Sequence, residues 1–186
     1  MTNKRTKMLT LASMMTAIII VLGFFPGIPL GFIPVPIIIQ NLGILLTIEL
    51  LGPKYSFLSI CLFLLLALFG LPILSGGRGG FAVFMGPTGG YILGWLLAPL
   101  VLGIILHILN HQQILSWWLE LIVVIVAGVL FIDVVGSIWL ALQSHMPLSA
   151  ALFSNIAFLP GDIIKACLSV FLARRLRKLP HLQGLI

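Results

Sequence analysis

"PTGGYILGWLLAPLVLGIILHI", residues 87–108, runs without a single Asp, Glu, Lys or Arg. A helix that crosses a bilayer needs about 20 consecutive apolar residues, and this stretch is long enough. The whole chain has the same character, because 61% of its 186 residues are hydrophobic and 8% are charged. A soluble domain has about a quarter of its residues charged, so this chain has too few to cover a water-exposed surface. The sequence therefore predicts an all-α integral membrane protein.

Further apolar segments, separated by Pro, Gly and polar residues, predict additional spans. With residues 87–108 they make six membrane helices. The other five predicted spans are 8–25, 36–51, 56–69, 117–142 and 158–176. No repeat with a period of about 20–50 residues divides the sequence. We therefore expect residues 1–186 to form a single transmembrane domain, one bundle of helices.

Basic residues at both ends of the chain set the expected orientation. The net charge is +6. The terminal basic residues are Lys4, Arg5, Lys7, Arg174, Arg175, Arg177 and Lys178. The positive-inside rule places both termini in the cytoplasm, as an even number of spans allows. The same residues are placed to contact anionic membrane lipids. No basic stripe with interleaved aromatics is present, so nucleic acid is not expected as a partner. The sequence thus predicts a multi-pass protein of the cell membrane.

The sequence lacks the motifs of common catalytic sites. Its glycine-rich segment has no lysine at phosphate-loop spacing, and no H-E-x-x-H or paired Cys and His motif suggests a metal. No nucleophile stands beside a base. We expect no catalytic residues, no metal site and no enzyme activity. Among the acids within the predicted spans, Glu49 is expected to reach the interface or pair with Lys54, whereas the pattern assigns no role to Asp133.

Two charges stand close together in "PGDIIK", residues 160–165. Asp162 and Lys165 are three residues apart, so they project from one face of a helix. One interpretation makes Asp162 the N-cap of the last helix and Lys165 its ion-pair partner. Burying charge in a bilayer costs several kcal/mol, however, and a cap needs no lysine. The pattern favours a pair that anchors a small polar ligand.

A third charge lies in "RGGFAVFMGPTGGY", residues 78–91. Glycines flank Arg78, so backbone N–H groups such as that of Gly79 are able to approach a ligand. A guanidinium group matches the geometry of a carboxylate. Tyr91 offers a flat apolar face and a hydroxyl group. A solvated loop arginine is the alternative for Arg78.

The first two spans carry weaker signals. Gln40 and Asn41 lie one turn into the second span, where amides need hydrogen-bond partners from another helix or from a ligand. In the first span, Ser13 and Ala17 form a small-xxx-small pair that suits close contact with another helix. That helix belongs either to this bundle or to a partner protein.

These segments resemble one known family. "VPIIIQNLGILL", "GGRGGFAVFMGPTGGYILGW" and "PGDIIK", taken together, in order and at plausible spacing, look like the BioY family. These are the biotin-binding S components of energy-coupling factor (ECF) vitamin transporters of bacteria and archaea. The resemblance covers about residues 34–174. It implies six membrane helices in a prokaryotic plasma membrane, and biotin as a transported ligand rather than a cofactor. It also implies an ECF transmembrane coupling protein and two ABC ATPases as partners.

The resemblance also implies roles for the candidate residues. Asp162 would accept hydrogen bonds from the ureido group of biotin while Lys165 donates to a nearby acceptor. Gln40 would add a polar contact, and Phe84 and Tyr91 would flank the ring. Arg78 and neighbouring N–H groups, including that of Gly79, would meet the biotin carboxylate, although Lys165 is an alternative partner for it. Ser13 and Ala17 would dock the coupling protein, and the glycine-rich loop would close over the ligand.

Three other functions remain open at this point. The chain could be an S component for another small vitamin, or a membrane enzyme that uses Asp162 and Lys165 as an acid–base pair. It could also be an autonomous secondary carrier, which would normally show an inverted repeat.

Overall fold

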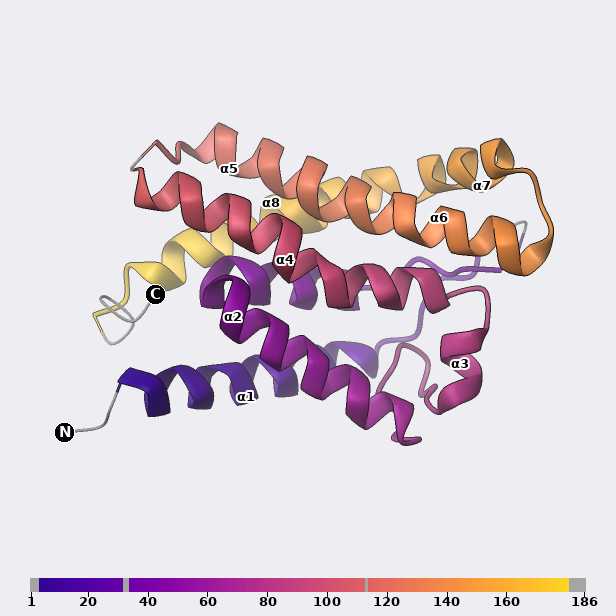
Figure 1. Ribbon diagram of the computed structural model, residues 1–186, viewed down its shortest axis with the longest axis horizontal. Coiled ribbons are helices and arrows are strands. Elements are labelled where there is room, and N and C mark those ends of the chain that lie inside the picture. The colour runs from indigo at the N-terminus through magenta and orange to yellow at the C-terminus, as the bar shows by residue number, and fades with distance from the viewer. Residues whose placement is uncertain (1–3, 32–33, 113, 181–186) are drawn as a thin grey trace.

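The computed structural model describes residues 4–31, 34–112 and 114–180, and these residues form a helical bundle (Figure 1). β structure among them is limited to two isolated bridges, Ile28–Ile37 and Leu74–Arg78. The α-helices are α1 (Lys4–Gly23), α2 (Gln40–Leu68), α3 (Phe81–Met85), α4 (Gly89–His111), α5 (Trp117–Val123), α6 (Phe131–Ser144), α7 (Leu148–Ser154) and α8 (Leu159–Arg177). A π-helical turn, η1 (Val124–Leu130), joins α5 to α6, and a 3₁₀ turn, η2 (Asn155–Ala157), precedes α8.

The helix lengths confirm a multi-pass membrane protein. In the described part of the chain, four helical stretches are long and apolar enough to cross a membrane. They are α1, α2, α4 and the continuous stretch Trp117–Ser144. The segments Leu148–Ala157 and α8 pass the same test as a pair that is bent by 57°. The predicted spans 87–108, 117–142 and 158–176 correspond to α4, α5–α6 and α8.

The predicted spans 36–51 and 56–69 correspond to the two halves of α2, which is kinked between them. Gly52 has φ 67° and ψ 179°, a conformation that residues with a Cβ rarely adopt. Pro53 follows and has no N–H to continue the helical ladder. The "GPKY" sequence therefore bends the backbone between the two halves of α2. Figure 1 shows α2 bent at this point.

Different helix ends and short helices lie at the two ends of the bundle. The start of α1, the start of α5 and the end of α8 lie together, and we call this the terminal end (Figure 1). The short helices α3 and α7 lie at the opposite end, the pocket end (Figure 1). α2 runs through the middle and packs against α1, α4 and α8.

A polar seam joins α1 to α2. Thr16 Oγ1 lies 3.0 Å from the carbonyl oxygen of Ser59, and Ser59 Oγ donates to the carbonyl oxygen of Ala12 at 3.0 Å. Small side chains let the two helices approach closely here. The inward face of α1 is therefore formed by Ala12 and Thr16, whereas Ser13 and Ala17 are exposed on its outer face.

Candidate functional site

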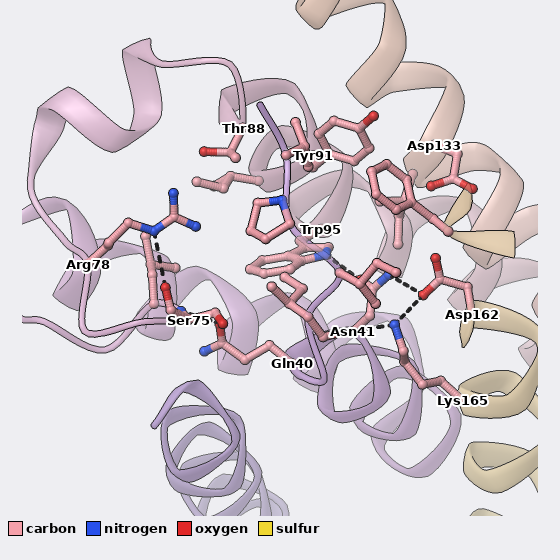
Figure 2. Close-up of a pocket in the computed structure, with 18 of the residues that line it drawn as sticks. Gln40, Asn41, Ser75, Arg78, Thr88, Tyr91, Trp95, Asp133, Asp162 and Lys165 are labelled. Atoms are coloured by element: carbon pink, nitrogen blue, oxygen red, sulfur yellow. Dashed lines mark hydrogen bonds and ion pairs between the residues drawn. The ribbon is translucent and has the colours of Figure 1, made fainter. Parts of the chain in front are cut away.

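A cavity with an empty volume of about 620 Å³ opens at the pocket end (Figure 2). Its wall comes from the start of α2, the glycine-rich loop, α4, α6 and the start of α8. Five of the predicted site residues line it: Gln40, Arg78, Tyr91, Asp162 and Lys165. The structure thus brings together residues that are up to about 125 positions apart in the sequence.

Asp162 and Lys165 form an ion pair in the wall of the cavity. Lys165 Nζ lies 2.7 Å from Asp162 Oδ1, and the two side chains are 12% and 4% exposed. The ammonium group also donates to the carbonyl oxygen of Ile38 at 2.8 Å. An ammonium group has three donors, so one remains for a ligand. Among the described residues, Asp162 Oδ2 has no hydrogen-bond donor, so it remains as an acceptor.

The alternative that Asp162 caps the last helix is wrong. α8 begins at Leu159, and its N-cap is Phe158. Asp162 lies inside the first turn, where its backbone N–H donates to the carbonyl oxygen of Phe158 at 2.9 Å. Its carboxylate turns to Lys165 and Asn41 instead of capping α8.

Asn41 and Trp95 hold this carboxylate from the other side. Trp95 Nε1 donates to Asn41 Oδ1 at 2.6 Å, and Asn41 Nδ2 donates to Asp162 Oδ1 at 3.2 Å. The indole N–H only donates, so it fixes which end of the amide faces Asp162. These contacts link α4, α2 and α8 through one short chain of hydrogen bonds.

Gln40 fastens the glycine-rich loop to the bundle. Its side chain is fully buried, and Nε2 donates to the carbonyl oxygens of Ile19 at 3.1 Å and Ile73 at 2.9 Å. Oε1 accepts from the backbone N–H of Ser75 at 2.9 Å. Both amide donors and the carbonyl are therefore engaged by the protein, which makes Gln40 a support of the pocket wall.

Arg78 lies across the cavity from the Asp162–Lys165 pair (Figure 2). Its Nε donates to the carbonyl oxygen of Ser75 at 3.1 Å, and the backbone bridge between Leu74 and Arg78 closes the turn. No described residue bonds to the two terminal guanidinium nitrogens. The fork is thus oriented by the loop and open to a ligand.

Tyr91 is held by a buried network behind the cavity. Its hydroxyl donates to Asn155 Oδ1 at 2.9 Å, and Asn155 Nδ2 donates to Ser137 Oγ at 2.7 Å. A Cβ at Gly136 would lie 2.4 Å from the Tyr91 ring, so glycine is needed for this close approach. The ring also meets Phe158 edge-on, with 6.2 Å between centroids. Tyr91 therefore presents its ring, not a free hydroxyl, to the cavity.

Asp133 is a further buried acid in the wall. The residue is 3% exposed, and Oδ2 has no hydrogen-bond partner among the described residues. An unpaired acceptor at such depth is costly unless something else bonds to it. A ligand with N–H or O–H groups would supply that bond.

The structure does not bring Gly79 and Phe84 into this wall. A Cβ at Gly79 would lie 2.2 Å from the carbonyl oxygen of Leu71, so its glycine serves a close backbone contact. Phe84 lines a separate apolar groove together with Cys61 and Trp139. Their contact with a ligand stays a prediction that this geometry does not support.

Sequence reasoning missed several residues of the wall. Asp133 stood out as an acid within a predicted span, but the sequence showed no nearby partner residue from which a role could be inferred. Asn41 was considered together with Gln40, but only Gln40 was expected to contact the ligand, whereas the structure places Asn41 beside Asp162. Trp95 gave no signal, because its function depends on packing between distant segments.

The fold and the pocket define a membrane-embedded binding protein for a small polar ligand. The cavity is mostly apolar, with polar groups at two opposite sides, and its formal charges balance. The described residues contain no group of three or more His, Cys, Asp or Glu able to hold a metal ion.

Comparisons with known proteins give the family. A model described as "BioY family" matches residues 1–181. The chain is 54% identical over 176 residues to "Biotin transporter BioY" of Lactococcus lactis subsp. cremoris (strain MG1363), covering 95% of this chain and 93% of that protein. It is 44% identical over 158 residues to "Probable biotin transporter BioY" of Bacillus subtilis (strain 168), covering 85% and 83%. The chain belongs to the BioY family.

A solved structure agrees with this assignment. The S-component for biotin from an ECF-type ABC transporter matches with a TM-score of 0.92 and 54% sequence identity. The match covers 96% of this chain and 95% of that one. The family prediction is confirmed.

Proposed function

We propose that this chain captures biotin from outside the cell with high affinity and delivers it for ATP-driven uptake by an ECF module. The proposal rests on one observation, that the charged groups of the pocket lie on two opposite sides of it. Asp162 and Lys165 stand on one side with an unused acceptor and donor, and the Arg78 guanidinium stands on the other. Biotin has the same division, with a ureido group at one end and a carboxylate at the other. Named biotin transporters among its relatives support the same ligand.

The geometry favours one orientation of biotin. Oδ2 of Asp162 and Oδ2 of Asp133 are acceptors without donors from described residues, and the ureido group carries two N–H donors. The free donor of Lys165 is available to the ureido carbonyl. The carboxylate then extends toward Arg78, and the glycine-rich loop that carries Arg78 covers the ligand.

The proposed membrane topology has six spans. Counting α2 as two spans on either side of Gly52, the chain crosses six times through α1, both halves of α2, α4, α5–α6 and α8. An even count returns the chain to the side where α1 begins, and the basic residues there make that side cytoplasmic. The pocket end then faces outward, where the vitamin is captured.

The outer face of α1 is the proposed docking site for the coupling protein. Ser13 and Ala17 are exposed, and Ser13 Oγ donates to the carbonyl oxygen of Leu9 at 3.1 Å, so its hydroxyl needs no outside partner. Small side chains of this kind allow another helix to approach closely. Ala17→Leu should abolish ATP-driven biotin uptake with the coupling protein and two ABC ATPases while biotin binding persists. Met14→Leu, a neighbouring exposed site, is the control. Equal uptake by both variants would reject this docking face.

A titration of the purified protein tests the proposed ligand. We expect saturable binding of one biotin per chain in detergent, without conversion of the ligand, measured by calorimetry and by mass spectrometry of the recovered biotin. Parallel titrations with thiamine and riboflavin test the alternative that another small vitamin is bound. Tight binding of thiamine or riboflavin without binding of biotin would show that this other vitamin, and not biotin, is the ligand. Recovery of chemically altered biotin would favour an enzyme.

A further inference from the structure

A second hollow lies at the terminal end, far from the biotin pocket. It has an empty volume of about 1360 Å³ and lies between the start of α1, the kink of α2, the end of α4 and the end of α8. The proposed function gives it no role. In the described part of the chain, the cationic residues that line it are Lys4, Arg5, Lys54 and Arg177. Glu49 is the only acid among these described lining residues, so they carry an excess of positive charge.

The charged groups of this hollow are positioned in different ways. Arg177 is fixed in the wall, because its guanidinium donates to Glu120 Oε1 at 2.7 Å and to the carbonyl oxygen of Glu49 at 2.8 Å. Lys54 is exposed, and its ammonium lies 5.9 Å from the centre of the Tyr55 ring. A cation–π contact at an exposed site is weak, so Lys54 is able to turn toward an anion.

Glu49 supplies an independent sign of a missing partner. Its side chain is 4% exposed, and Ser169 Oγ donates to Oε1. Oε2 has no hydrogen-bond partner among the described residues. A ligand that fits this wall therefore combines an anionic group for the lysines with an O–H or N–H donor for Glu49.

The position of the hollow favours a membrane lipid over a free anion as this ligand. The start of α5 lies at the same end of the bundle (Figure 1). Its Trp118 is 69% exposed, and aromatic residues of this kind are enriched at the level of lipid headgroups. Met8 and Leu106 add apolar surface to the hollow. Basic pockets between membrane helices on the cytoplasmic side suit phospholipid headgroups. Free phosphate offers the anion but has no acyl chain for the apolar surface.

We propose that this hollow binds the headgroup of one phospholipid whose phosphate meets the lysines and whose hydroxyl or ammonium group meets Glu49. Phosphatidylglycerol and phosphatidylethanolamine have this chemistry. Phosphatidylcholine has the phosphate but no N–H or O–H donor. The comparison of phosphatidylethanolamine with phosphatidylcholine, which have equal net charge, therefore isolates the contact with Glu49.

The test measures lipid retention by the full-length protein with native mass spectrometry. We expect the dioleoyl forms to bind in the order phosphatidylglycerol, phosphatidylethanolamine, phosphatidylcholine, with about tenfold between the first and the last. Glu49→Gln should remove the difference between phosphatidylethanolamine and phosphatidylcholine, because Ser169 occupies the remaining carbonyl oxygen. Equal retention of all three lipids by the unaltered protein would overturn the proposal.

A matched pair of double variants separates this hollow from general charge attraction. Lys4→Gln with Lys54→Gln removes two charges from the hollow, and Lys7→Gln with Arg175→Gln removes two exposed charges outside it. We expect the first pair to reduce phosphatidylglycerol retention about fivefold and the second to change it less than about twofold. Equal losses of phosphatidylglycerol retention in the two double variants would mean that basic residues attract the lipid without a specific site, and would overturn the proposal. Displacement of the lipid by millimolar sodium phosphate would assign the hollow to free phosphate instead. Biotin titration checks that all variants are folded.

Discussion

Two buried acids at opposite ends of this molecule, Glu120 and Asp162, are bonded in different ways. At the terminal end, both carboxylate oxygens of Glu120 are taken by Arg174 and Arg177, and its side chain is 0% exposed. At the pocket end, Asp162 is almost as deeply buried, but one of its oxygens is bonded and the other has no donor among the described residues. The comparison teaches that burial of charge alone does not mark a binding site. Unused hydrogen-bonding capacity beside a cavity does.

The largest expected effect is on stability and comes from the terminal end. Glu120→Gln leaves Arg174 and Arg177 without their counter-charge, and removing one partner of a buried ion pair costs about 3–5 kcal/mol. Both arginines are partly exposed, so we expect the lower end of that range. Thermal unfolding in detergent measures it, with Arg175→Gln as a control of small effect. Wild-type stability in Glu120→Gln would remove the distinction between the two ends.

The next largest effect is on binding and comes from the pocket end. Lys165→Ala removes the cation beside Asp162 and the donor available to biotin. We expect affinity for biotin to fall about 100-fold, which is about 2.7 kcal/mol, in an equilibrium titration. Lys7→Ala, on the exposed face of α1, should leave affinity unchanged. Unaltered affinity in Lys165→Ala would mean that the ion pair is structural, as it is at the other end.

The kink of α2 provides a prediction about the backbone alone. A Cβ at Gly52 would meet no atom within 4 Å, so Gly52→Ala should destabilise the fold only through its positive φ. Such strain costs about 1–3 kcal/mol. At Gly161 the added Cβ makes an ordinary contact of 3.8 Å with Ile37, so Gly161→Ala is the matched control. Equal unfolding temperatures for the two variants would show that the kink does not require glycine.

The smallest expected effect tests the orientation of the ligand. Arg78→Ala should weaken biotin binding about tenfold, or about 1.4 kcal/mol, because it removes the partner of the carboxylate. Biotin methyl ester lacks that charge, so its affinity should change much less. An equal loss for biotin and its ester would place the carboxylate elsewhere, with Lys165 as the alternative partner.

The sequence was sufficient to predict the elements that depend on long apolar runs. The predicted span 158–176 differs from α8 by one residue at each end, because Pro160 marks its first turn and the arginines mark its last turn. The five-residue helix α3 was not predicted, since it is too short to show a hydrophobic period and lies among glycines. The continuity of α2 was also missed, because Gly52 and Pro53 look like a turn between two helices.

The charged residues of the candidate site could be predicted from the sequence. Arg78, Asp162 and Lys165 stand out in an apolar sequence, and all three line one cavity. The support of that cavity depends on pairing between segments far apart in the chain, such as Trp95 with Asn41. No local pattern encodes such a contact. Contact of Ser13 and Ala17 with a coupling protein stays a prediction.

The most direct test of the central claim compares two buried acids at opposite ends by the same substitution. Biotin is titrated against the unaltered protein, Asp162→Asn and Glu49→Gln, each of which exchanges one carboxylate for its amide. We predict that Asp162→Asn weakens binding at least about tenfold, because the amide nitrogen cannot accept a hydrogen bond, whereas Glu49→Gln stays within about twofold. Equal affinity in Asp162→Asn and the unaltered protein would contradict the assignment of the pocket. So would an equal loss in both variants.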